Sequence, residues 1–186
     1  LVTSIKKHKK VIFNGDSYSK EWAKEADKRG LCNFKTTVEA LEHSLDDKNL
    51  KLFETHGVLS EREMKSRYGI HMENYCNVIH IEAKTLSSMV KSEILPAVTK
   101  YTNHIVKAMI EKKQLGENIS CEYESNMIKK FSDISSRLYK NVEELSEADN
   151  SASMIPDIEK RAHEYRDKIV DCMKKIRTDI NCAEIY

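Results

Sequence analysis

The stretch that decides the fold is Ser60–Gln114, which reads SEREMKSRYGIHMENYCNVIHIEAKTLSSMVKSEILPAVTKYTNHIVKAMIEKKQ. Apolar or aromatic residues recur in it with a mean spacing of about 3.6 residues, which is the period of an α-helix. The residues between them are largely charged or polar, so the stretch predicts one amphipathic helix with a continuous apolar face. That face is formed by Tyr68, Met72, Tyr75, Ile79, Ala83, Leu86, Val90, Ile94, Ala97, Tyr101, Ile105 and Ala108.

Both ends of this helix carry recognisable signals. Ser60 is followed three residues later by Glu63, the spacing of a capping box in which each side chain satisfies the backbone N–H of the other residue. Lys112 and Lys113 suit the negative end of the helix dipole, and Gly116 follows as a stop signal. At 1.5 Å per residue such a helix is roughly 80 Å long. It needs other helices to cover its apolar face.

One proline lies inside the stretch. Pro96 lacks an N–H and its ring clashes with the preceding turn, which predicts a kink near Ser92–Leu95. The apolar spacing continues through Ala97 and Tyr101 beyond the proline. We therefore expect one bent helix, or two nearly coaxial ones, with the apolar face in the same phase on both sides.

Two further apolar stripes of helical period follow. Residues 119–148 carry the first and residues 158–183 the second, separated by a loop expected at Asn150–Ser153. Pro156 suits the first turn of the last helix, where an N–H has no intrahelical acceptor. The fold class predicted is all-α: an antiparallel bundle of three long helices, the first kinked at Pro96.

The region before the bundle has weaker signals. Val11–Phe13 predicts a short strand, closed by the turn residues Asn14, Gly15 and Asp16, with its pairing strand outside this sequence. Short helices are expected over Ser19–Arg29, from a capping box at Thr36 to about Leu45, and around Leu50–Phe53, the last ending at Gly57. We expect residues 1–59 to form a segment of short strand and small helices and residues 60–186 to form the bundle.

Composition narrows the class of protein. The 186 residues are 40% hydrophobic and 33% charged, which is typical of a helical protein. The net charge of +1 gives no strong positive potential that would attract nucleic acid or anionic lipid. A basic cluster at Lys6–Lys10 leaves a nucleic-acid patch open as the weaker alternative to a solvated helix end. No transmembrane run and no signal peptide is recognisable. The five cysteines lack metal-type spacing, as expected of reduced thiols in a cytoplasmic protein.

No residue is proposed as catalytic, cofactor-binding or metal-ligating. The di-iron pattern Glu-x-x-His is absent, and Glu39/His43 and Glu159/His163 have the four-residue spacing of ordinary surface ion pairs. His71 and His80 lie off the centre of the apolar face, and neither histidine is assigned a metal.

Cysteine and methionine also favour structural interpretations. Cys76 lies beside the apolar face, which favours burial, and Cys182 lies near the last helix end, so neither is proposed as a nucleophile. The seven methionines form no Met-rich box and are expected to fill the core. Glycine-rich phosphate loops are absent.

Three stretches are more specific. They are VIFNGDSYSKEW from Val11 to Trp22 with EADKRGL from Glu25 to Leu31; LFETHGVLSE from Leu52 to Glu61 with Ser66–Tyr68; and Ile81–Ala83 with Ile94–Ala97 and Tyr101. Together they closely resemble the C-terminal region of type III glutamine synthetases. The resemblance is strong over residues 5–110 and rests more on pattern over residues 119–180.

The resemblance implies a parent enzyme that joins ammonia to glutamate with ATP and Mg²⁺ or Mn²⁺, whose ligands lie on a β-rich catalytic domain upstream. No motif of that domain occurs here, so no catalytic residue is transferred. The Trp-Pro-x-Pro-x-Tyr segment usual near the end of the family is also absent. The implied role is a non-catalytic C-terminal domain that braces its catalytic domain or contacts other subunits of a large homo-oligomer. The alternative is a free-standing helical interaction protein.

Overall fold

The computed structural model describes residues 2–116 and 118–185, and these residues form helices without a β-strand. The all-α prediction is therefore confirmed. In chain order the elements are α1 (Val2–Lys7), the 3₁₀ turn η1 (Lys9–Val11), α2 (Lys20–Lys28), α3 (Thr37–Glu42), the 3₁₀ turn η2 (His43–Leu45), α4 (Asp47–Thr55), α5 (Glu61–Met89), the π-helical turn η3 (Val90–Ile94), α6 (Leu95–Leu115), α7 (Glu122–Ser153), α8 (Ile158–Glu164), the π-helical turn η4 (Tyr165–Ile169) and α9 (Val170–Glu184).

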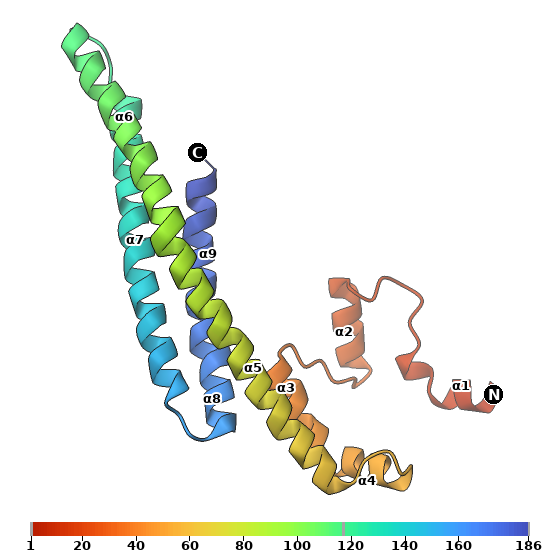
Figure 1. Ribbon diagram of the computed structural model, residues 1–186. Coiled ribbons are helices and arrows are strands. Elements are labelled where there is room, and N and C mark those ends of the chain that lie inside the picture. Colours follow the sequence, from red (N-terminus) through yellow and green to blue (C-terminus); the bar gives the residue numbers. More distant parts are fainter. Residues whose placement is uncertain (1, 117, 186) are drawn as a thin grey trace.

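The long helix forms as predicted, from α5 through η3 to α6 (Figure 1). At its start the Ser60 hydroxyl accepts from the Glu63 N–H, and the Glu63 carboxylate accepts from the Ser60 N–H at 2.8 Å. At its end Lys112 and Lys113 occupy the last turn, and Gly116 takes a φ of +151°. The capping residues therefore set both ends.

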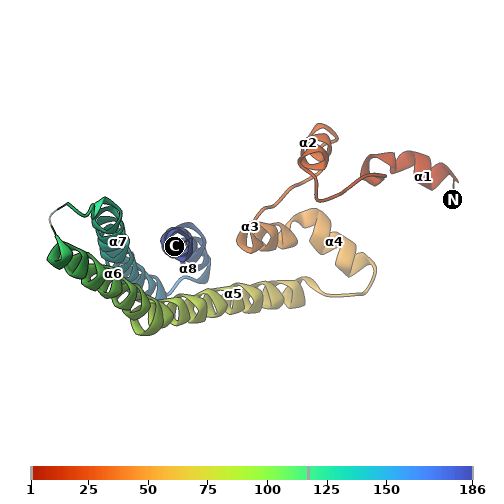
Figure 2. The ribbon, with the colours of Figure 1, turned by 90° about the horizontal axis from the view of Figure 1, so that it is seen from above.

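An irregularity lies where Pro96 predicted one, and the helix bends between α5 and α6 (Figure 2), but the irregularity also shifts the phase of the apolar face. Immediately before Pro96 the helix widens into η3, whose i→i+5 bonding accommodates one extra residue in the turn. That residue shifts the buried face, so Val98 is buried and Ala97 is exposed. The expectation of an unchanged phase across Pro96 is wrong for this reason. Leu86, another residue of the predicted stripe, is half-buried.

α7 runs antiparallel to α6 and α5 and supplies the centre of the core (Figure 1). Its buried apolar side chains are Met127, Phe131, Ile134, Leu138, Val142, Leu145 and Ala152. The loop predicted at Asn150–Ser153 is wrong, because α7 continues to Ser153. Ala152 is fully buried there, and the hydroxyls of Ser151 and Ser153 donate to carbonyls within the same helix.

The third arm of the bundle comprises α8, η4 and α9. Asp157, rather than Pro156, caps it by accepting a hydrogen bond from the Lys160 N–H at 2.9 Å. Pro156 thus lies just before the helix and not in its first turn. Tyr165 and Ile169 of η4 are fully buried against α5 and α7. The antiparallel bundle of three long arms is confirmed within the described residues.

The strand predicted at Val11–Phe13 is wrong. Val11 ends η1, and Arg29 donates to the carbonyl oxygens of Lys10 (3.3 Å) and Ile12 (2.9 Å). Arg29 also lies over the Trp22 ring, on which Phe13 stacks at 4.3 Å. Side chains of α2 and its C-terminal cap therefore hold this segment, and carbonyls that a strand ladder would use are bonded to a guanidinium.

The small helices largely follow the prediction. The Ser19 hydroxyl caps α2, and the Thr36 hydroxyl caps α3. The Thr36 box is incomplete, because Glu39 accepts from the Lys35 N–H rather than from that of Thr36. Gly57 ends α4 with a φ of +63°, which lets the Val58 N–H reach the Phe53 carbonyl at 2.9 Å.

Figures 1 and 2 show that α3 and α4 pack near the start of α5, whereas α1 and α2 stand apart from the bundle. The main core joins α3, α5, α7, α8, η4 and α9. A smaller apolar cluster links α6 to α7 towards the far end of the bundle and is formed by Val98, Ile105, Met127 and Phe131.

Candidate functional site

Residues capable of chemistry are dispersed. Among the described residues, no three His, Cys, Asp or Glu side chains gather where they could hold one metal ion. The predicted pairs Glu39/His43 and Glu159/His163 do not form, because each of these side chains has a partner elsewhere. His43 pairs with Asp46 at 3.2 Å, and the other three lie at an interface between elements.

Two of the cysteine thiols lack the features of a nucleophile. Cys76 is buried, as predicted, and burial raises the pKa of its thiol. Burial likewise raises the pKa of the half-buried Cys172. A thiol with a raised pKa stays protonated at neutral pH and is a poor nucleophile. Cys182 is half-buried, and Cys32 is exposed.

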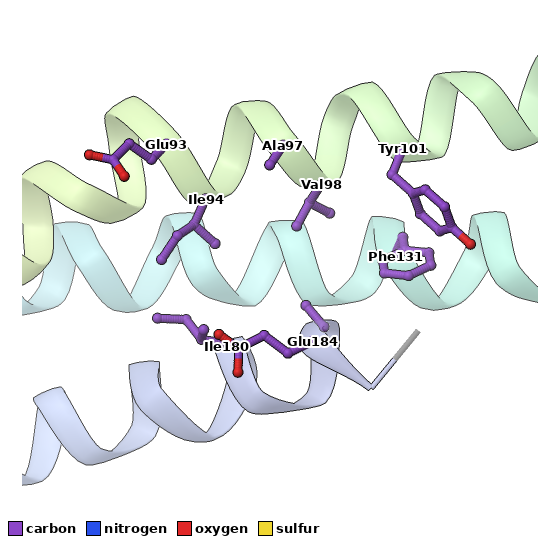
Figure 3. Close-up of a pocket in the computed structure, with 9 residues that line it drawn as sticks. Glu93, Ile94, Ala97, Val98, Tyr101, Phe131, Ile180 and Glu184 are labelled. Carbon is purple, nitrogen blue, oxygen red and sulfur yellow. The ribbon is translucent and has the colours of Figure 1, made fainter.

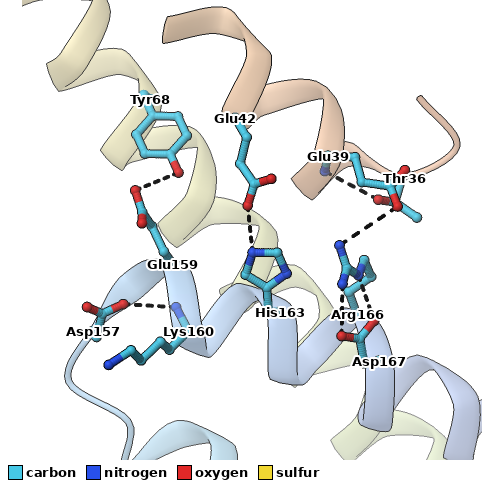
Figure 4. A network of polar contacts seen from close by, with 10 residues as sticks. All are labelled: Thr36, Glu39, Glu42, Tyr68, Asp157, Glu159, Lys160, His163, Arg166 and Asp167. Carbon is cyan, nitrogen blue, oxygen red and sulfur yellow. Dashed lines mark hydrogen bonds and ion pairs between the residues drawn. The ribbon is translucent and has the colours of Figure 1, made fainter. Parts of the chain in front are cut away.

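The most developed polar arrangement joins α3 to α5, α8 and η4, and we call it the α3 seam (Figure 4). It comprises Glu39, Glu42, Tyr68, Glu159, His163 and Arg166. His163 Nε2 lies 2.6 Å from Glu42 Oε1, Tyr68 donates to Glu159 at 2.9 Å, and Arg166 lies 3.8 Å from Glu39. Burial, aided by Glu159, raises the pKa of the Tyr68 hydroxyl, which therefore remains a hydrogen-bond donor.

An apolar anchor lies beneath the α3 seam. Val38 of α3 is fully buried within the main core, and Leu41 and Leu45 pack against that core. The polar pairs above it are partly exposed, with Glu42 and His163 each 38% exposed at the side chain. Exposed ion pairs contribute little free energy, whereas burying a valine contributes about 1.5–3 kcal/mol. Val38 therefore supplies most of the free energy that holds α3 on the bundle, and the polar pairs fix the position of α3 along it.

A buried polar cluster ties three arms together. Asp149 of α7 is buried, and its Oδ1 atom lies 2.8 Å from Nδ1 of His80 on α5 and accepts from the Tyr165 hydroxyl of η4 at 3.2 Å. Burial and the neighbouring Asp149 raise the pKa of the Tyr165 hydroxyl, so it stays protonated and donates. His80 is thus half-buried and partnered. The arrangement joins α5, α7 and η4 within the bundle.

A groove opens where α9 ends beside α6 and α7 (Figure 3). It has a volume of about 380 Å³ and is lined mainly by Ile94, Val98, Tyr101, Phe131 and Ile180. Tyr101 packs edge to face on Phe131, with ring centroids 5.2 Å apart. The lining is apolar, and the carboxylates of Glu93 and Glu184 are the charged groups beside it. Such a groove suits an apolar side chain more than a polar metabolite.

An ion pair fastens the far end of the α6–α7 hairpin. Lys112 of α6 donates to Glu124 Oε1, and within the described residues the other carboxylate oxygen of Glu124 is buried without a hydrogen-bond partner. This pairing lowers the pKa of Glu124. The folded chain therefore binds a proton at Glu124 less readily than the unfolded chain does. The pair stabilises the fold at pH values above the ordinary glutamate pKa, and this stabilisation is lost as the pH falls through the lowered pKa of Glu124.

The N-terminal segment exposes apolar side chains. Val2, Ile5, Val11 and Ile12 are exposed on α1, η1 and the residue after it, and Tyr18 is 98% exposed. Contiguous exposed apolar residues mark contact surfaces. These exposed residues form the best-supported candidate site, a docking surface, and the α3 seam joins the segment that carries them to the bundle.

Comparison with known proteins points to one family. Residues 1–113 match the family model described as the glutamine synthetase C-terminal domain. A glutamine synthetase of Butyrivibrio fibrisolvens is 31% identical over 95% of this chain and 25% of its own length. A type-3 glutamine synthetase of Dictyostelium discoideum is 40% identical over 55% of the chain and 14% of its own length. A glutamine synthetase of Bacteroides fragilis is 26% identical over 94% of the chain and 25% of its own length.

The chain thus spans about a quarter or less of the length of these relatives. None of the helices in residues 2–116 and 118–185 combines the length and apolar character needed to cross a membrane.

Proposed function

The chain belongs to the glutamine synthetase C-terminal domain family, and from this premise we propose that it is a non-catalytic helical domain of a type III glutamine synthetase that braces the catalytic domain. Residues 1–59 form the segment that contacts the catalytic domain, and residues 60–186 form the supporting bundle. The parent enzyme joins ammonia to glutamate in the cytoplasm, as one subunit of a large homo-oligomer.

The exposed apolar surface of the N-terminal segment is the observation that carries this proposal. Ile5, Val11 and Ile12 are each more than 40% exposed. Leaving several such side chains in water loses the stabilisation that burial would give, about 25 cal/mol for each Å² of apolar surface. Contact with another domain of the same polypeptide would recover it. The α3 seam would then transmit the position of this segment to the bundle.

ATP and Mg²⁺ or Mn²⁺ are proposed to bind the upstream catalytic domain of the parent. The described residues gather no group of three metal-type ligands. We assign no step of the reaction to this chain. Its contribution is to packing and assembly.

A first experiment tests whether a longer polypeptide carries the chain. An immunoblot of source cells with an antibody raised against the chain should reveal a band several times heavier than 21.5 kDa. A band at 21.5 kDa would favour a free-standing helical interaction protein and overturn the proposal.

A second experiment tests the bracing. In the longer polypeptide, Ile5→Asp with Val11→Asp should reduce both subunit assembly and glutamine formation, because the carboxylates would be buried at the contact. Met154→Asp is the matched control, since Met154 is 81% exposed in the turn between α7 and α8. Unchanged assembly and rate in the double variant would contradict the bracing role.

A further inference from the structure

The outer face of α5 carries a second apolar stripe, opposite the face that packs in the core. The exposed apolar residues of this stripe are Ile70, Val78, Ile81 and Met89. Charged residues would be expected on this face, since 33% of the chain is charged. Ile81 is 62% exposed. Figure 2 shows α3, α4, α7 and α8 all on one side of α5, so the opposite side is clear of these helices. An exposed stripe of this kind marks a surface that contacts another helix.

The stripe has an internal symmetry. Six exposed, uncharged residues form it, and we call them the outer stripe: Ile70, Asn74, Val78, Ile81, Thr85 and Met89. They are spaced by 4, 4, 3, 4 and 4 residues, and their side chains are in turn apolar, polar, apolar, apolar, polar and apolar. Both the spacing and the order of side-chain types are the same when read in either direction.

From this symmetry we infer that the outer stripe is a contact between two copies of this chain, with their α5 helices antiparallel about a two-fold axis between Val78 and Ile81. A two-fold contact brings a surface patch against itself, so the patch must be self-complementary. Reversing the stripe satisfies this: Ile70 faces Met89, Asn74 faces Thr85, and Val78 faces Ile81 of the other copy. Every apolar residue meets an apolar residue, along about 29 Å of helix.

Two charges on one flank of the stripe agree with the same arrangement. Glu73 and Lys84 are 11 residues apart, which places them on one flank of α5, and both are exposed. Neither takes part in an ion pair within the described residues. They lie at nearly equal distances on either side of the two-fold axis. In the antiparallel pair each Glu73 therefore lies beside Lys84 of the other copy, offset by about 3 Å along the axis. In a parallel pair this flank would lie on opposite sides of the two copies, and Glu73 and Lys84 would not meet across the contact.

This inference rests on the outer face of α5 alone. It holds whether or not the N-terminal segment braces a catalytic domain, because none of the residues of the outer stripe belongs to that segment. Failure of the bracing experiment and failure of the present one are therefore distinguishable.

The test is the mass of the 186-residue chain by sedimentation equilibrium, in reducing buffer because Cys32 is exposed. The mass should rise with concentration from 21.5 kDa towards twice that value. Ile81→Glu should weaken dimerisation by about tenfold or more, because a carboxylate would enter the centre of the contact. Ile110→Glu is the control, since Ile110 is similarly exposed but lies on α6. Unchanged helical circular dichroism at 25 °C will show that both variants are folded.

Charge exchange tests the orientation. Glu73→Lys and Lys84→Glu should each weaken the dimer, and the two changes together should restore it, because the opposite charges are re-formed across the axis. A monomer at every concentration up to the solubility limit would overturn the inference. So would a dimer that is equally sensitive to Ile110→Glu, or one that Ile81→Glu leaves intact. A dimer whose single charge variants are not rescued by the double variant would overturn the antiparallel arrangement.

Discussion

Val38→Ala should loosen α3 from the bundle without unfolding the bundle. Val38 is fully buried in the main core, where α3 contacts α5, and the substitution removes two methyl groups. At about 0.8 kcal/mol for each buried carbon the transfer cost is about 1.6 kcal/mol, and the cavity left behind raises the total to about 2 kcal/mol. The half-exposed pair of Glu42 and His163 contributes too little to compensate.

Native-state hydrogen exchange resolves this effect from global unfolding. A loss of about 2 kcal/mol corresponds to about 30-fold faster exchange of the α3 amides through local opening. The amides of α7 should exchange at the unchanged rate when local opening is the dominant route. Val58→Ala is the matched control, because Val58 is 60% exposed and the chemical change is identical.

Two results would refute this reasoning. If the α3 amides exchange at the same rate in Val38→Ala and in the unsubstituted chain, Val38 is not the anchor of α3. If the exchange rate of the α7 amides rises by the same factor as that of the α3 amides, α3 and the bundle unfold together and α3 does not open independently.

Three further changes test the interior and the caps. Tyr165→Phe removes one of the donors to the buried Asp149, so the free energy of unfolding in urea should fall by about 2 kcal/mol with the helical circular dichroism unchanged. Lys112→Met should destabilise the chain at pH 7. The difference from the unsubstituted chain should shrink as the pH falls below the ordinary glutamate pKa and through the lowered pKa of Glu124, because protonation removes the pair that only the unsubstituted chain forms; denaturation at several pH values will show this. Ser60→Ala should cost about 1 kcal/mol in thermal or urea unfolding through loss of the α5 cap.

Local signals in the sequence predicted most of the helical framework. The period of the apolar residues identified three long arms, and the capping box at Ser60 located the start of the first, because caps act over three or four residues of neighbouring chain. The predictions that failed depended on distant partners. Val11–Phe13 has the composition of a strand, but Arg29 bonds the carbonyls on either side of Val11.

The phase error at Pro96 has a different origin. Propensity and periodicity assume 3.6 residues in every turn, so a pattern of apolar residues does not reveal one widened turn. Here Ala97 and Val98 are both apolar, and the choice between them depends on whether η3 contains an extra residue. The sequence pattern fits either choice. Only packing against α7 decides between them.

The polar contacts between helices were less predictable than the helices themselves, although the sequence carried one signal of them. Asp149 lies four residues after Leu145 and three before Ala152, within the apolar stripe of α7, and Glu124 lies three residues before Met127 on the same stripe. A carboxylate at a core position requires a partner. The identity of that partner was not predictable, because His80 and Lys112 come from other helices. The α3 seam is likewise made of residues distant in sequence.

The position of the α3 seam makes it the mechanical link of the molecule. A brace needs a rigid body, and the buried cluster at Asp149 joins α5, α7 and η4 within the bundle. It also needs a point of attachment, and we propose that the exposed apolar residues of α1 and η1 provide it. Between these two parts the described chain passes through α2 and then α3, and α3 contacts the bundle. A displacement of the N-terminal segment therefore reaches the bundle through Val38 and its neighbours. In the longer polypeptide, Val38→Ala should then weaken assembly even though it lies outside the docking surface itself.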